Sequence, residues 1–312
     1  MQMRVILIVA VAMAVLSGCG QNDGSTSDGR PVVVATTTQL ADLARQIGGP
    51  DVDVRQLLKP NSDPHEYEPR PKDVQAAARA KLILTSGLGL DSWMKEIRSA
   101  SGTDARVVDV GASVPTRLPG AGDEAGDADP HWWHDPQNMR AAATTVERAL
   151  TAAGPDAAPR IAARARAYHA RLARLDARIR ACFDRIPPAR RTIVTDHDAF
   201  AYFVHRYGLR YVGAVIPAQT TQAQASAGDL ARLEDTIRRE HVAAVFPESS
   251  VNKRLARRIA KDTGASVGGT LYGDALGPAG GPAGTYIGME QANADALVRG
   301  MTGGRDGCPA GA

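Results

Sequence analysis

The stretch PDAAPRIAARARAYHARLARLDARIRACFDRI, Pro155 to Ile186, lies mid-chain and predicts one long helix. It is rich in Ala, Arg and Leu and contains no glycine. After Pro155, which begins the stretch, its only proline is Pro159, near the start. Its apolar positions recur at helical spacing and include Tyr168, Leu172, Leu175 and Ile179. At about 1.5 Å per residue the helix reaches roughly 40 Å, which is enough to support two lobes as a rigid connector.

Short apolar runs alternate with helical patterns on both sides of this connector. The apolar runs are PVVVATTT (31–38), VDVRQLL (52–58), KLILTSG (81–87), ARVVDVG (105–111), RTIVTDH (191–197), YVGAVIP (211–217), AAVFPES (243–249) and SVGGTLY (266–272). Such alternation predicts parallel sheets flanked by helices. We therefore expect an α/β protein with two (β/α) sandwich lobes, residues 31–154 and 187–312, joined by a rigid helix over 155–186.

The composition is that of a soluble globular protein, with 44% hydrophobic and 23% charged residues. The net charge of +3 comes largely from arginines of the connector, which we interpret as a solvated face. These arginines are Arg164, Arg166, Arg171, Arg174, Arg178 and Arg180. The net positive charge therefore does not indicate nucleic-acid binding.

The first twenty residues, MQMRVILIVAVAMAVLSGCG, predict export. Arg4 precedes an apolar run over 5–16 that is too short to span a bilayer. The residues before Cys19 resemble a bacterial lipobox, so we expect a signal peptide over 1–18 and acylation of Cys19. An ordinary signal with a chance cysteine is the alternative. The Gly- and Ser-rich residues 19–30 predict a flexible tether, and stable anchoring to the outer face of the cell membrane requires two or more acyl chains.

Cys182 and Cys308 are the remaining cysteines, and export places them where disulfides persist. They could join the end of the connector to the C-terminal tail. Two unpaired buried thiols are the alternative, which is disfavoured because the Gly-rich tail around Cys308 offers no core.

Four of the seven histidines lie near predicted loops. His197 directly follows the run RTIVT, where an open α/β sheet holds its ligands. His65 lies between Pro64 and Pro69, which restrict the backbone around it. The other two are His131 and His134, in the segment DADPHWWHDPQN (127–138). For His169, His205 and His241 we expect surface or packing roles.

Backbone restriction separates His131 from His134. Pro130 and Pro136 favour an extended or turning segment rather than a helix, so the two rings would point apart. Asp135 and Pro136 predict the N-cap and first residue of a following helix. We therefore take His131 as a metal ligand and His134 as a bystander.

Asp274 follows the run SVGGTLY and completes a candidate metal site. His65, His131, His197 and Asp274 come from strand ends of both lobes, and three imidazoles with one carboxylate suit Zn²⁺. Four protein ligands leave no open coordination position, and the chain contains no HExxH, GxSxG or CxxC motif. The sequence therefore favours a binding protein, and a zinc-dependent hydrolase remains an unsupported alternative.

Six segments, in order, resemble the metal-specific solute-binding proteins of bacterial ABC transporters, the cluster A-I or ZnuA-like family. They are SDPHEYEPRPKDV, KLILTSGLGLDSWM, DPHWWHDPQN, TDHDAFAYFVHRYGL, VFPESSVNK and LYGDALGPAGGPAGTYIGMEQAN. The resemblance covers about Val32 to Gly300 and implies a metal bound between two lobes by the four residues above. Zinc-type members commonly have His where manganese-type members have Glu, so His197 favours zinc over manganese.

The chain also departs from the family pattern. The segment PGAGDEAGDAD (119–129) has acidic residues where many zinc members carry a His-rich loop, and we interpret it as a solvated loop, with weak cation collection as the alternative. His134 occupies a position that is usually apolar. Glu248 matches a family motif, and we expect it to support a ligand or a lid rather than to bind the metal itself.

The resulting prediction is a monomeric, lipid-anchored, extracytoplasmic receptor that captures Zn²⁺ and delivers it to an ABC permease with its ATPase. It is not an enzyme, and it does not bind nucleic acid. The alternatives are a manganese or iron receptor of the same fold, and a surface adhesin-type lipoprotein in which the metal is structural.

Overall fold

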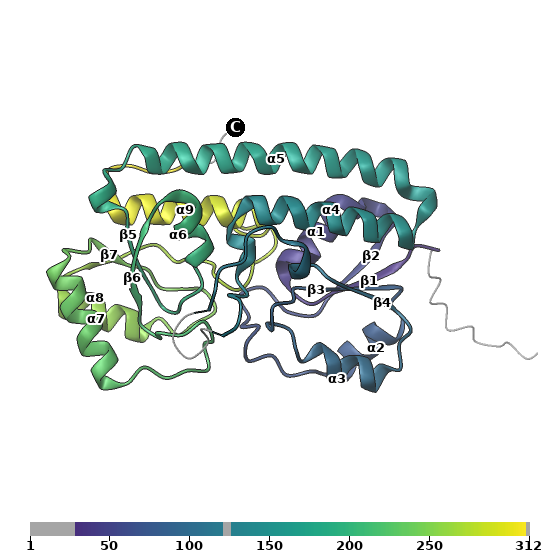
Figure 1. Cartoon of the computed structure of the whole chain (residues 1–312), viewed down its shortest axis with the longest axis horizontal. Coiled ribbons are helices and arrows are strands. Elements are labelled where there is room, and N and C mark those ends of the chain that lie inside the picture. The colour runs from purple at the N-terminus through teal and green to yellow at the C-terminus, as the bar shows by residue number, and fades with distance from the viewer. Residues whose placement is uncertain (1–28, 121–125, 310–312) are drawn as a thin grey trace, which may run out of the picture.

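A parallel sheet of four short strands forms the first lobe (Figure 1). The computed structural model describes residues 29–120 and 126–309, and the strand order in this sheet is β2-β1-β3-β4. The strands are β1 (Val32–Ala35), β2 (Asp53–Gln56), β3 (Leu82–Thr85) and β4 (Arg106–Asp109). The helices of this lobe are α1 (Thr38–Gly48), α2 (Pro71–Ala78), α3 (Met94–Ser101) and α4 (Pro136–Ala153).

Both faces of this sheet are covered, which explains the apolar runs of its central strands β1 and β3. Val33 of β1 packs into a large cluster with α1 and α4, whereas its neighbour Val34 packs into a second cluster with α2 and α3. Successive strand residues point to opposite faces, so each must be apolar when helices cover both sides.

The second lobe repeats this arrangement with shorter strands. Strand β5 (Thr192–Thr195) pairs with β6 (Arg210–Ala214), and β7 (Ala244–Val245) pairs with β8 (Ser266–Val267), all in parallel. The backbone N–H of Phe246 donates to the carbonyl of Val194 at 2.8 Å and links the two pairs. The helices are α6 (Ala201–Tyr207), α7 (Ala227–Arg239), α8 (Arg254–Thr263) and α9 (Tyr286–Thr302). The predicted α/β architecture is therefore confirmed.

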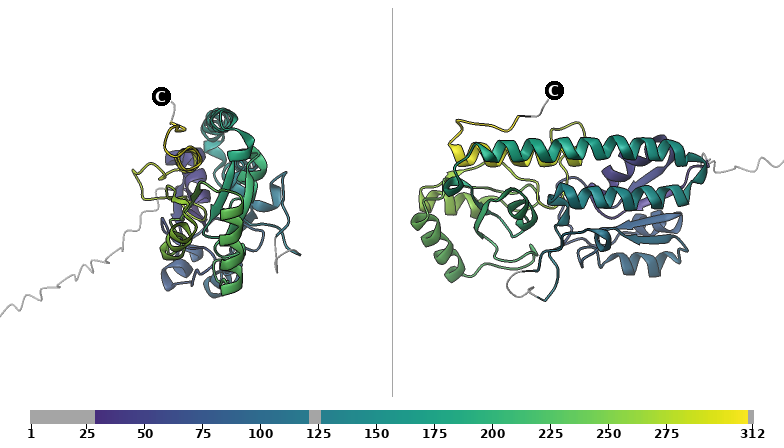
Figure 2. Two further views of the ribbon diagram at one scale, coloured as in Figure 1. Left: turned by 90° about the vertical axis from the view of Figure 1, so that its left-hand side faces the viewer. Right: turned by 45° about the horizontal axis from the view of Figure 1, so that its top comes forward.

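One long helix, α5 (Ala158–Asp184), follows a short turn at Pro155–Ala157 and joins the lobes. It packs on α1 and α4 of the first lobe and on α6 and α9 of the second, and both views in Figure 2 keep it on the outside of the molecule. Its predicted apolar positions, Tyr168, Leu172, Leu175 and Ile179, are all buried. The lobe boundaries at 154/155 and 186/187 remain predictions.

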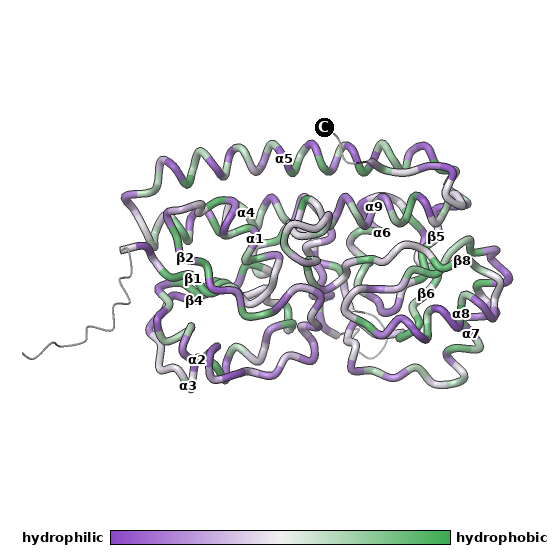
Figure 3. Tube along the Cα trace, turned by 180° about the vertical axis from the view of Figure 1, so that it is seen from behind, coloured by the Kyte–Doolittle hydropathy of each residue, from purple (hydrophilic) through white to green (hydrophobic). Residues whose placement is uncertain are grey.

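A single hydrophobic cluster continues beneath α5 from one lobe into the other. It includes Val33 of β1 and Phe246 beside β7, together with the buried face of α5. In Figure 3 the strands of both lobes are largely hydrophobic, whereas α5 alternates between hydrophilic and hydrophobic turns. The lobes therefore share a core instead of meeting only across a solvated cleft.

The arginines of α5 are not all solvated, which corrects the prediction. Arg164 donates to the carbonyls of Ile47 and Gly48 at 2.8 and 2.7 Å and pairs with Asp51 at 2.5 Å. It thereby satisfies carbonyls at the end of α1 that have no partner within that helix. Arg178 bonds Gln291 of α9 at 3.3 Å. Because α5 lies against other helices along its length, arginines at the edge of its buried face meet polar groups of those helices.

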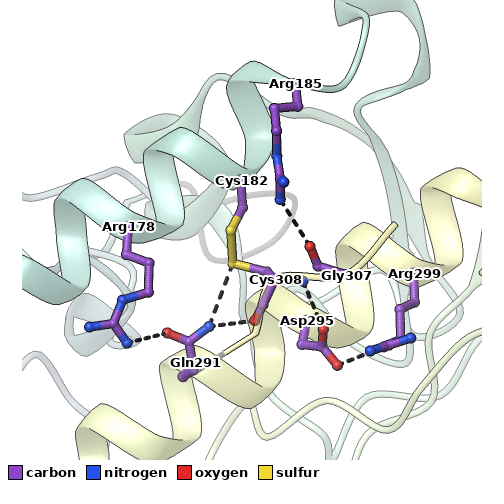
Figure 4. Close-up of a disulfide and its surroundings, with 8 residues drawn as sticks. All are labelled: Arg178, Cys182, Arg185, Gln291, Asp295, Arg299, Gly307 and Cys308. Atoms are coloured by element: carbon purple, nitrogen blue, oxygen red, sulfur yellow. Dashed lines mark hydrogen bonds and ion pairs between the residues drawn. A yellow bond between two sulfur atoms is a disulfide. The ribbon is translucent and has the colours of Figure 1, made fainter. Parts of the chain in front are cut away.

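A disulfide joins Cys182 of α5 to Cys308 in the C-terminal tail, with their Cα atoms 5.5 Å apart (Figure 4). Hydrogen bonds on both sides hold the tail. Gln291 of α9 donates to the carbonyl of Cys308 at 2.6 Å, and the N–H of Cys308 donates to Asp295 at 2.7 Å. The tail is thus tied across α9 to the connector helix.

Several predictions fall outside the described residues. These are the signal peptide, Cys19, most of the tether, and Asp123 and Glu124 of the acidic segment. Over residues 29–120 and 126–309, no helix is both long and apolar enough to cross a bilayer.

Candidate metal centre

His65 lies on the loop between β2 and α2. The side chain of Asp63 accepts the backbone N–H of His65 at 2.8 Å, and Trp93 donates to the carbonyl of Pro64 at 3.3 Å. These bonds and the flanking prolines fix the loop on the first lobe. The His65 side chain is 9% exposed, and it is the outermost of the four predicted ligands.

His131 precedes a short 3₁₀ turn, Trp132–His134, that leads into α4. The Asp129 carboxylate accepts from both the backbone N–H and the Nδ1 of His131, at 2.9 and 2.8 Å. With its Nδ1 donating to Asp129, the ring presents Nε2 to the centre as an acceptor. Asp129 is fully buried, which corrects its assignment to a solvated loop. The sequence clue was its position two residues before His131.

Asp135 caps α4 as predicted, because its side chain accepts the N–H of Gln137 and Pro136 is the first helical residue. The segment as a whole turns rather than extends, so His131 and His134 face different groups.

His197 follows β5, at the carboxyl end of the second sheet. Glu248, which follows β7, accepts from the backbone N–H and Nδ1 of His197 at 2.9 and 3.1 Å. The side chain of Asp196 in turn accepts the backbone N–H of Glu248 at 2.7 Å. Glu248 therefore supports His197 in the same way that Asp129 supports His131.

Asp274 lies in the turn between β8 and α9. Its Oδ2 accepts a hydrogen bond from Ser250 at 2.9 Å, and its backbone carbonyl accepts one from Gln39 of α1 at 3.0 Å. The other carboxylate oxygen, Oδ1, faces the three imidazoles. The turn of the second lobe is thus held partly by the first lobe.

The four side chains converge on one point. Oδ1 of Asp274 lies 3.3 Å from Nε2 of His197, 3.4 Å from Nε2 of His131 and 3.6 Å from Nε2 of His65. The Nε2 atoms of His65 and His131 are 3.3 Å apart, and all four atoms lie within 4.8 Å of one another. A tetrahedron with metal–ligand bonds of about 2.0–2.1 Å has edges of about 3.3 Å, so these four distances of 3.3–3.6 Å fit a four-coordinate ion.

Two of these atoms are buried with no hydrogen-bond partner among the described residues. They are Nε2 of His197 and Oδ1 of Asp274. A buried polar atom without a partner is costly, and a metal ion bound by all four atoms would remove that cost. The donor set therefore fits a cation at its centre.

The electrostatics of the centre also favour a cation. Burial alone would lower the pKa of His131, but the hydrogen bonds and charges of Asp129 and Asp274 together outweigh it and raise that pKa to about 9. Burial would likewise lower the pKa of His197, yet the charges of Asp274 and Glu248 raise it well above its usual value. Burial would raise the pKa of Asp274, but the imidazoles hold it well below its usual range. The carboxylates thus stabilise positive charge, whether carried by protons or by a metal ion.

A cavity of about 480 Å³ opens beside His65. It is lined by residues of both lobes, including Leu88, Trp93, Asp127, Gln219 and Thr220. His131, His197 and Asp274 are at most 1% exposed, so the His65 side is the route by which solvent approaches the centre.

His134 is not part of the converging group, but it is no bystander. It is fully buried, its Nδ1 lies 2.8 Å from the Glu290 carboxylate, and its Nε2 lies 2.9 Å from the carbonyl of Gly273. The sequence missed this role because Glu290 is 156 positions away in the chain. As predicted, His205 and His241 are exposed and His169 packs at the edge of α5.

The fold and the converging side chains define the class of metal-binding, substrate-binding proteins of ABC transporters. The structure superposes on the periplasmic zinc-binding protein TroA of Treponema pallidum with a TM-score of 0.82, at 34% identity, covering 88% of this chain and 99% of TroA. The family model "Zinc-uptake complex component A periplasmic", ZnuA, matches residues 33–300, and the chain belongs to this family.

Curated relatives are named for different metals. The manganese-binding lipoprotein MntA of Halalkalibacterium halodurans is 32% identical, and the match covers 96% of this chain and 97% of MntA. The iron-binding protein YfeA of Yersinia pestis is also 32% identical, and the match covers 90% of this chain and 89% of YfeA. Members of the family are solute-binding receptors and not enzymes, and their names do not agree on one metal.

Proposed function

We propose that this protein is a Zn²⁺ receptor that holds the ion with His65, His131, His197 and Asp274. The observation that carries the proposal is that Oδ1 of Asp274 lies 3.3–3.6 Å from Nε2 of all three imidazoles, with all four atoms within 4.8 Å of one another. Imidazole is a borderline donor that suits zinc, whereas Mn²⁺ prefers oxygen-rich sites.

The Ser250 contact gives a second reason for zinc. Its hydroxyl donates to Oδ2 of Asp274 and so favours binding of the ion through Oδ1 alone. A carboxylate that binds through one oxygen keeps the coordination number at four, which is the usual number for zinc in protein sites. Manganese commonly takes more oxygen ligands, and among the described residues Asp274 is the only carboxylate in the group of potential ligands.

A manganese or iron receptor is the alternative, because MntA and YfeA are named for those metals. Competition titration of zinc, manganese and iron, on chelator-stripped protein that lacks the first 28 residues, distinguishes these possibilities. We expect Zn²⁺ to bind most tightly, and tighter binding of Mn²⁺ would reject zinc as the cargo. His131→Ala and His197→Ala should each lower Zn²⁺ affinity by orders of magnitude while His205→Ala, at an exposed histidine outside the centre, leaves it unchanged.

Delivery completes the proposed function. Relatives are named as lipoproteins of ABC transporters, which supports a membrane permease with its ATPase as the partner. We place the receptor, as a monomer, on the outer face of the cell membrane through an acylated Cys19. Mass analysis of the membrane fraction should find the mature N-terminus at an acylated Cys19, and a Cys19→Ala chain should be released in soluble form. A strain lacking the receptor should grow poorly when zinc is limiting.

A further inference from the structure

The carbonyl of Gly273, the residue immediately before Asp274, accepts two hydrogen bonds from the first lobe. Trp133 donates through Nε1 and His134 through Nε2, each at 2.9 Å. A Cβ at Gly273 would lie 2.3 Å from the Glu248 carboxylate, so a larger residue would displace the group that holds His197. The peptide that leads into Asp274 is therefore tightly enclosed.

The carbonyl fixes the tautomer of His134. Because a carbonyl oxygen can only accept, the Nε2 of His134 must carry a hydrogen. Its Nδ1 faces Oε1 of Glu290 at 2.8 Å, and these two atoms share one further proton. The pair is therefore neutral as a whole, whichever of the two atoms carries that proton.

Burying the His134–Glu290 pair does not by itself stabilise the fold. Both side chains are fully buried, and Oε2 of Glu290 has no hydrogen-bond partner among the described residues. The ring of His134 also stacks on the apolar ring of Phe200, with centroids 4.5 Å apart. A well-packed apolar pair is often as stable as, or more stable than, a buried ionic one. The polar atoms therefore call for a role beyond packing.

We propose that His134, held by Glu290, is a positioning residue that fixes the Gly273 peptide and thereby aims Oδ1 of Asp274 at the metal. The inference rests on the proposed metal site. His134 belongs to the first lobe and Asp274 to the second, so a residue of one lobe orients a ligand supplied by the other. Groups that orient ligands in this way typically contribute roughly 10- to 100-fold to metal affinity.

The deciding experiment separates positioning from stability. In the double variant His134→Phe/Glu290→Met, an apolar pair of similar size replaces the buried polar pair. We expect its metal-free thermal stability to stay near that of the unmodified protein, while Zn²⁺ affinity falls by roughly tenfold or more. The visible spectrum of bound Co²⁺, which reports ligand geometry, should change as well. Glu290→Gln is the conservative control, because its amide can donate to Nδ1, so affinity and spectrum should be retained.

A second variant keeps the proposal testable if the double variant does not fold. Trp133→Phe removes the other donor to the Gly273 carbonyl while keeping an aromatic ring there, and it should also weaken Zn²⁺ binding and alter the Co²⁺ spectrum. Unchanged affinity and spectrum in a folded variant that lacks either donor would overturn the proposal. Failure of the metal site itself would be seen separately, as Zn²⁺ binding unaffected by His131→Ala.

Discussion

The carboxylate of Asp129 lies 2.8 Å from Nδ1 of His131, on the side of the ring opposite the metal centre. This contact holds the ring so that Nε2 faces the other ligands, and it makes the imidazole a stronger donor.

Asp129→Ala should therefore weaken Zn²⁺ binding by roughly 10- to 100-fold. Asp129→Asn should lower Zn²⁺ affinity by less, because the side-chain oxygen of Asn can still accept a hydrogen bond from Nδ1 of His131. Competition titration measures both, with Asp127→Ala as a control at an exposed acid of the same segment. Equal affinities for Asp129→Ala and Asp127→Ala would contradict the orienting role of Asp129.

Acidification should release the metal, because Zn²⁺ needs neutral imidazoles. The pKa of His131 in the metal-free fold is raised to about 9, so protons compete with the metal from about that pH downward. Affinity should fall steadily below this pH and should be accompanied by proton release on binding. Calorimetry in buffers of different ionisation enthalpy measures the release, and binding without any proton release would contradict the raised pKa.

The folding stability of the metal-free protein should rise as the pH falls, whereas the Zn²⁺ affinity falls. A folded-state pKa raised from 6.5 to about 9 gives His131 a stabilising contribution that is complete below about pH 6.5 and lost as the pH rises towards 9. Thermal unfolding of stripped protein across this range measures it. His131→Ala is the control, and it should flatten that part of the stability profile.

Two hydrogen bonds across the lobes hold the loop that carries His65. Gln222 donates to the carbonyl of His65 at 2.6 Å, and Thr221 donates to the side chain of Asp63 at 2.5 Å. The variant Thr221→Val/Gln222→Ala should therefore release Zn²⁺ faster while its ligands are retained. Chelator-driven release followed by stopped flow measures the rate, with the exposed neighbour Gln224→Ala as control. If both proteins released Zn²⁺ at the same rate, these bonds would not restrain the loop.

The Cys182–Cys308 disulfide closes a segment of 126 residues. Its removal in Cys182→Ser/Cys308→Ser should lower the free energy of unfolding by about 2–5 kcal/mol. Because the bond joins α5 to the tail beyond α9, away from the ligands, Zn²⁺ affinity of the folded variant should be unchanged. Denaturant unfolding and titration test both points. Alkylation of the intact protein should find neither thiol free, and modification of both would refute the bond.

Strands such as β1, β3 and β5 could be predicted because each is a buried apolar run between turn signals, but helix α9 could not. The residues of α9 that are buried include polar Glu290 and Asn293 beside Met289 and Leu297. Because α5, α1 and β7 contact this helix, its burial leaves no clear apolar stripe to read. Amphipathic α7, which is solvated on one side, was correspondingly easy to recognise.

The four residues of the centre were predictable because each follows a strand or a restricted loop. Their supporting partners were not. Glu248 lies 51 positions from His197 and Glu290 lies 156 positions from His134, and only the fold brings them together. Asp129 was near enough in sequence to be seen, but its neighbours Asp123, Glu124 and Asp127 made it look like part of a solvated acidic run.

The core that continues beneath α5 has a consequence for any transporter that docks with the receptor. Opening the lobes as rigid halves would expose apolar side chains of this shared core, at about 25 cal/mol for each Å² exposed. We therefore expect the empty and loaded molecules to have nearly the same outline. A docking partner would then distinguish a filled receptor from an empty one by the loops around His65 and Gln222, at the mouth of the site.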